Sequence, residues 1–139
     1  PGVLCARRHG ILTMIQNDEM LTRLLDALST LRVPATGTEY DLHALIAASL
    51  ERGGFVVSHE EKLGPRCRID FLVGDIGIEV KRGKIARRPL LAQCTRYLSS
   101  DRLRALIVVG EKAFHLPETL CGKPLIAFGV NRLWGVALP

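Results

Sequence analysis

The hydrophobic positions in the N-terminal third of the chain follow a helical period. Apolar side chains in residues 14–32 recur every three or four positions, which predicts a helix with one apolar face. The same spacing predicts a second helix that begins after Thr38 and ends at Gly53 and Gly54, because threonine is a favoured N-cap and glycine a favoured helix end. Residues 1–12 show no such period, and we expect them to be irregular.

Beyond the second helix, shorter apolar runs predict strands. We expect a strand at about residues 55–59 and a tight hairpin at about 66–73 and 76–82, closed by a Gly-Asp turn. A third helix is expected to run to about Ser99 with Pro89 in its first turn, where proline is well suited.

The C-terminal part is predicted to add further strands. Residues 103–109 are rich in β-branched side chains and read as a buried strand, and two short strands are expected near 124–128 and 133–138. The predicted order from about 38 to 110 is helix, three strands, helix and strand. A length of 139 residues suits one domain, so we expect a single α/β domain with the first helix and the last strands as additions.

Composition narrows the class of protein. The chain is 47% hydrophobic and 24% charged, which is typical of a globular domain rather than a disordered one. No apolar run reaches the length of a membrane span, and no secretory signal is expected. The cysteines lack zinc or iron–sulfur spacing, and we expect reduced thiols in a cytoplasmic protein. They are Cys5, Cys67, Cys94 and Cys121.

The predicted hairpin carries charged residues among apolar ones. Asp70 lies in its first strand, and Glu79 and Lys81 lie two residues apart in its second, so these two side chains point the same way. The hairpin can fold Asp70 back beside Glu79. Such charges are costly unless something uses them, and a divalent cation would use the carboxylates. The alternative is an exposed hairpin with a surface salt bridge between Glu79 and Lys81.

The spacing of Asp70, eight intervening residues and Glu79-Val80-Lys81 resembles the PD-(D/E)xK nuclease superfamily, although Ile69 replaces the proline. That superfamily includes restriction endonucleases, Holliday-junction resolvases and the RecB and lambda-exonuclease branch. The resemblance implies a restriction-endonuclease-like core, with a central mixed sheet flanked by helices. It also implies that Asp70, Glu79 and the Val80 carbonyl hold Mg²⁺, for which Mn²⁺ can substitute, and that Lys81 assists the attacking water or the scissile phosphate.

Three further residues are catalytic candidates. Many members of this superfamily place another acid on the helix before the strands, and Glu39 occupies that place as a candidate metal ligand; its alternative role is to favour the helix dipole. Gln93 and Tyr97 are four residues apart and share a helical face. This pair resembles an extra motif of the RecB and lambda-exonuclease branch, which supports the nucleotide or orients groups of the site. The alternative is a polar helix face with a half-buried tyrosine.

Basic residues gather around these candidates. The net charge is +5 and the isoelectric point is about 9.4, which suits a polyanionic partner. Strand alternation predicts that Arg66, Arg68 and Asp70 share one face. A solvated basic surface is the alternative to phosphate contact. The candidates for nucleic-acid binding are Arg66, Arg68, Arg82, Lys84, Arg87, Arg88 and Arg96.

Together these features predict a magnesium-dependent nuclease that acts on DNA, with structure-directed or weak sequence specificity and no small-molecule cofactor. The resemblance to resolvases and restriction enzymes implies a homodimer. The alternative is a catalytically silent domain of the same fold that binds nucleic acid or assembles a complex. The pattern leaves open whether cleavage is internal or from an end, and whether DNA or RNA is the substrate.

Overall fold

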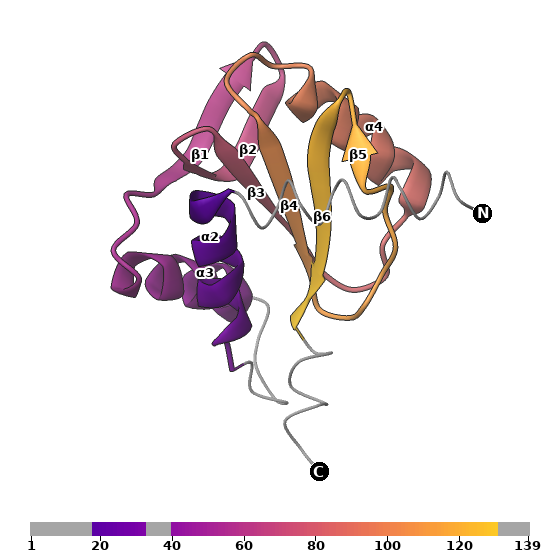
Figure 1. Ribbon diagram of the computed structural model, residues 1–139. Helices are drawn as coiled ribbons and strands as arrows, with labels where there is room; N and C mark the ends of the chain where they lie inside the picture. The colour runs from indigo at the N-terminus through magenta and orange to yellow at the C-terminus, as the bar shows by residue number, and fades with distance from the viewer. Residues whose placement is uncertain (1–17, 33–39, 131–139) are drawn as a thin grey trace, which may run out of the picture.

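The computed structural model describes residues 18–32 and 40–130, and its strands form one mixed sheet (Figure 1). The strand order is β1-β2-β3-β4-β6-β5; the β3–β4 and β4–β6 pairs are parallel and the other pairs are antiparallel. The predicted α/β class and the predicted order of core elements are therefore confirmed. The elements are α2 (Glu19–Ser29), α3 (Tyr40–Arg52), β1 (Ser58–Gly64), β2 (Cys67–Val73), β3 (Ile76–Lys81), α4 (Arg87–Leu98), β4 (Ala105–Gly110), β5 (Thr119–Leu120) and β6 (Lys123–Gly129).

Helices cover both faces of the sheet. Helices α2 and α3 pack against one face, where Ile76, Ile78 and Val80 of β3 join their core, and α4 packs against the other (Figure 1). Because both faces are covered, β4 is buried along its whole length. The near-continuous apolar runs of β3 and β4 follow from this double burial.

Some element boundaries differ from the prediction. The first helix begins at Glu19, after an Asp18 cap that accepts a hydrogen bond from Leu21 N at 3.1 Å, and it ends at Ser29 rather than at residue 32. Helix α4 starts at Arg87 and ends at Leu98, so Pro89 lies in its first turn as predicted. Thr38, residues 1–12 and 14–17 and the predicted strand 133–138 lie outside the described residues.

The first predicted strand exists, but its predicted bounds of 55–59 were too early along the chain. Strand β1 runs from Ser58 to Gly64, and the apolar residues before it form a connector in which Phe55 is buried and Val56 is 88% exposed. Among the described strands, β1 lies at the edge of the sheet and pairs only with β2, so most of its residues are polar and exposed. Such a strand carries no clear alternation, whereas the hairpin strands, buried between layers, were predicted to within a residue.

Two features hold the hairpin in register. Gly74 has φ of 61°, the positive value that a two-residue II′ turn requires at its first position. Arg104 donates from Nε to Asp75 Oδ1 at 2.7 Å and also pairs with Asp18, which ties the turn to the start of α2. The β2–β3 pair is therefore fixed at its turn end.

Two expectations from composition can be compared with the structure. Of the described helices, none has the length and apolar character needed to cross a membrane. The described cysteines are free thiols: Cys67, Cys94 and Cys121.

Candidate active site

The backbone ladder between β2 and β3 is replaced by side-chain hydrogen bonds at its open end. The ladder runs from the turn to the Phe71–Ile78 pair. Beyond it, Asp70 N donates to Glu79 Oε1 at 3.2 Å, and Val80 N donates to Asp70 Oδ2 at 2.8 Å. Each acid thus binds the backbone of the opposite strand, which brings the two carboxylates together as the hairpin was predicted to do.

The strands around Asp70 are irregular as well. Ile69 and Leu72 both pack on the α4 side of the sheet although they are three residues apart, and Phe71 packs on the α2–α3 side. Regular alternation is therefore interrupted at Asp70. On the neighbouring strand, Glu60 has φ of 48°, in the left-handed region that a glutamate adopts only under local constraint.

The prediction that Arg66, Arg68 and Asp70 share one face is wrong. Asp70 lines a cavity of about 380 Å³ with His43 and His59 on the α3 side. Arg66 and Arg68 instead line a cavity beside α4. The three residues predicted to share a strand face are therefore divided: Arg66 lies in the turn before β2, with φ of 54°, and strict alternation does not continue through Asp70.

Glu79 is the buried acid of the site. Only 4% of its surface is exposed, and its Oε2 accepts a hydrogen bond from Gln93 Nε2 at 3.0 Å. Lys81 Nζ lies 3.3 Å from the same oxygen. Burial, reinforced by the negative charge of Asp70, raises the pKa of Glu79 to about 7, and Lys81 offsets only part of that effect. The alternative of an exposed Glu79–Lys81 salt bridge is therefore wrong, because the Glu79 carboxylate of this pair is buried.

Two side chains of helix α4, Gln93 and Tyr97, form hydrogen bonds to the hairpin. Gln93 Nε2 also donates to Tyr97 Oη at 2.9 Å, and Tyr97 Oη donates to the Arg68 carbonyl at 2.8 Å. Burial, and then the charge of Glu79, raise the pKa of Tyr97, which keeps its phenol protonated as a donor. The predicted shared face of Gln93 and Tyr97 is confirmed, and it connects β2 to the Glu79 carboxylate.

The donors at the open end are hard oxygen atoms. Val80 N–H points toward β2, and a strand residue directs its N–H and C=O to the same side, so the Val80 carbonyl faces the gap that holds both carboxylates. Among the described residues, no three His, Cys, Asp or Glu side chains gather closely enough to hold a metal ion, and Glu39 lies outside them. Two carboxylates and a carbonyl fit Mg²⁺, which commonly takes one or two protein carboxylates and completes its shell with water and phosphate.

Two basic cavities flank this centre. The first, of about 450 Å³, is lined by Lys62, Arg66, Arg68 and Arg96 together with Gln93 and Tyr97. The second, of about 290 Å³, has Gln93 and Arg96 in common with the first and adds the cations Lys81, Arg82 and Lys84.

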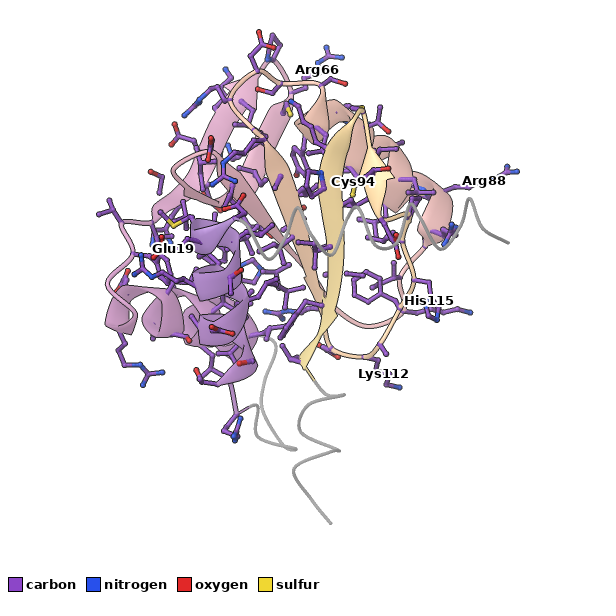
Figure 2. All side chains as sticks on the ribbon, viewed as in Figure 1. Glu19, Arg66, Arg88, Cys94, Lys112 and His115 are labelled. Atoms are coloured by element: carbon purple, nitrogen blue, oxygen red, sulfur yellow. The ribbon has the colours of Figure 1, made fainter. Side chains whose placement is uncertain are left out.

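The remaining basic candidates lie elsewhere. Arg87 Nη1 donates to the His115 carbonyl at 2.8 Å, and Arg88 projects outward from α4 (Figure 2). Lys62 was missed by the sequence reasoning. It lies directly opposite Arg68 in the β1–β2 register, and no local signal reveals this because β1 itself was misplaced.

Comparison of the chain with known protein families, curated proteins and solved structures finds no match. The functional argument therefore depends on the geometry of this site.

Proposed function

We propose that this protein is a magnesium-dependent nuclease that hydrolyses phosphodiester bonds in DNA. The observation that supports this most strongly is the reciprocal binding of Asp70 and Glu79 to each other's strands, with Lys81 beside them. Burial, and then the charge of Asp70, raise the pKa of Glu79, and Lys81 compensates only part of this rise. A divalent cation between the two strands would supply the remaining positive charge.

Each residue has a distinct part in this proposal. Asp70, Glu79 and the Val80 carbonyl would hold the ion, and Mn²⁺ can substitute for Mg²⁺. When bound, the ion polarises phosphate and lowers the pKa of water. The Lys81 ammonium, half-buried 3.3 Å from Glu79, is placed to stabilise negative charge that develops at the phosphorus. Gln93 orients Glu79, and Tyr97 in turn holds Gln93.

The positive charge around the centre supports a polyanionic substrate. The cations of the two basic cavities line them together with Gln93, the donor to Glu79, and would bind phosphates next to the reacting one. Aromatic residues form only 5% of the chain, so a base-stacking platform is not expected. Cations of this kind contact the phosphates of the nucleic acid rather than its bases, which supports structure-directed or weakly sequence-specific cleavage.

The test is a cleavage assay with Mg²⁺ or Mn²⁺ against an EDTA control. The substrates are linear duplex, single-stranded, flap and four-way-junction DNA. The control enzyme is Glu79→Gln, because glutamine keeps the shape and an acceptor for Asp70 N but carries no charge. We expect metal-dependent cleavage that the variant loses by at least about 100-fold.

A second readout does not depend on activity. Thermal unfolding with increasing Mg²⁺ should raise the melting temperature of the parent protein, because a ligand that binds only the folded state stabilises it. The rise should disappear in Glu79→Gln. Cleavage by both proteins alike would refute the site. Salt-sensitive DNA binding by the parent without cleavage or a metal response would favour a silent binding module instead.

A further inference from the structure

The two basic cavities beside α4 meet at the candidate active site. Both are lined by Gln93 and Arg96, so they adjoin along the same side of the helix. We call the cavity with Lys62, Arg66 and Arg68 the first arm, and the cavity with Arg82 and Lys84 the second arm. The described residues that line the two arms include no aspartate or glutamate.

The cations of the first arm are arranged against one another. Lys62 and Arg68 are direct partners in the antiparallel β1–β2 pair, and like charges in that position destabilise a sheet. Within the part of the chain that the structure describes, no carboxylate forms an ion pair with Lys62, Arg66 or Arg68. An anion bound between them would relieve this repulsion.

Part of the candidate site adjoins the junction of the arms, whereas Asp70 lines the cavity on the α3 side. Gln93, which lines both arms, donates to Glu79 at 3.0 Å, and Lys81 lines the second arm while it contacts the same carboxylate. Both basic arms therefore adjoin the contact between Gln93 and Glu79. A site that accepts a strand end needs phosphate contacts on one side of the cut only.

We infer that a nucleic-acid strand runs through both arms without a break, with the scissile phosphate at their junction, so that the enzyme cuts internally and needs no free end. This inference rests on the proposed nuclease function and assigns it to endonucleases. The volumes of the arms, about 450 and 290 Å³, are near the range of roughly 300–1,000 Å³ for small-ligand sites, which limits each arm to a short stretch of strand.

The decisive experiment compares circular and linear DNA of the same sequence. Single-stranded and covalently closed duplex circles, with their linear counterparts, are incubated with Mg²⁺ or Mn²⁺ and either the parent protein or Glu79→Gln. We expect the parent to open at least one circular form at a rate within about threefold of its linear counterpart. Degradation of linear DNA with both circles intact would overturn the inference and leave the nuclease proposal standing. Cleavage of neither form would overturn both.

A second experiment tests the two arms separately. The first-arm variant is Arg66→Gln with Arg68→Gln, and the second-arm variant is Lys84→Gln. The control is Arg52→Gln, which removes an exposed charge in the last turn of α3, on the face of the sheet opposite to α4. Binding to a single-stranded oligonucleotide is measured without metal at several salt concentrations. Each arm variant should lower the salt slope by about one for every phosphate that it no longer neutralises, and the control should leave the slope unchanged.

Shortening the oligonucleotide distinguishes an open groove from a general basic surface. Trimming from one end should abolish the effect of one arm variant, and trimming from the other end that of the second. If both arm variants lose their effect together, or neither depends on strand length, a strand does not run through the arms in series and the inference is wrong.

Discussion

The two ends of the β2–β3 hairpin are joined by different kinds of hydrogen bond. At the turn end, backbone hydrogen bonds join the strands from Val73–Ile76 to Phe71–Ile78, and the side chains are buried and apolar. At the open end, the side chains of Asp70 and Glu79 take over the backbone donors. The same pair of strands therefore serves as core at one end and as a charged site at the other.

The two ends also differ in how far their charges are balanced. The turn end is complete, because apolar side chains are packed and backbone groups are paired. The buried side chains of the open end have hydrogen-bond partners, since the described residues include no buried side-chain donor or acceptor without one. Its charges are only partly balanced, because burial and then the charge of Asp70 raise the pKa of Glu79 and Lys81 offsets part of that rise. The turn end therefore contributes packed apolar contacts and backbone hydrogen bonds, whereas the open end carries negative charge that a cation would compensate.

The largest expected effect is the loss of cleavage in Asp70→Asn. Asparagine can still accept the hydrogen bond from Val80 N, so the strands stay in place, but the negative charge is gone. Metal-dependent cleavage should fall by at least about 100-fold in a single-turnover assay, while the free energy of unfolding without metal stays equal or rises. Asp101→Asn, an exposed acid in the turn after α4, is the matched control and should cleave normally. Equal loss in both variants would mean that the carboxylate of Asp70 has no special part.

The opposite result is expected at the turn end. Ile78→Ala removes a fully buried side chain from the α2–α3 core and should lower the free energy of unfolding by about 2–5 kcal/mol in urea denaturation. The folded fraction should keep its cleavage rate. Val56→Ala is the control, because that side chain is 88% exposed and its loss should cost at most about 0.5 kcal/mol. A loss of cleavage without a loss of stability in Ile78→Ala would erase the distinction between the two ends.

The sequence predicts the turn end far better than its surroundings. Apolar strands bounded by Gly74 and Asp75 carry a signal within the segment itself, so their limits were predicted to within a residue. β1 could not be found in this way, because its exposed, polar residues follow no period and its position depends on pairing with β2. β5 was not predicted, since its two residues pair only with the start of β6.

The candidate site was predictable where spacing fixes geometry. The two-residue and four-residue intervals placed Glu79 with Lys81 and Gln93 with Tyr97, and the structure joins these pairs through one hydrogen bond. The exchange of hydrogen bonds around Asp70 was not predictable, because strict alternation assumes a regular strand. The partnership of Lys62 with Arg68 depends on the register between two strands, which a local pattern does not encode.

The pH dependence of stability should report the unbalanced charge directly. The pKa of Glu79 rises from an ordinary 4.5 to about 7 on folding, so the folded state binds more protons than the unfolded state between those values. Stability from this group is therefore present below about pH 4.5 and is lost as the pH rises to about 7, a change of about 3 kcal/mol.

Glu79→Gln isolates this contribution, because glutamine does not titrate. In urea denaturation with EDTA, the variant should gain about 3 kcal/mol relative to the parent between pH 4.5 and pH 8. Subtracting the two pH profiles cancels the other titrating groups to first order. Parallel profiles would show that Glu79 ionises as an exposed acid does. The buried charge at the open end would then cost no folding free energy.

The smallest expected effect concerns Tyr97, the residue by which α4 supports the open end from a distance. Tyr97→Phe keeps the buried ring but removes the donor to the Arg68 carbonyl and an acceptor for Gln93, while the bond from Gln93 to Glu79 can persist. We expect a loss of about 1 kcal/mol in the free energy of unfolding and only a few-fold fall in cleavage. Ser99→Ala, which deletes an exposed hydroxyl just after α4, should change neither measurement. If Tyr97→Phe abolished cleavage at unchanged stability, Tyr97 would belong to the reacting groups themselves, and the boundary of the charged end would extend from β3 into α4.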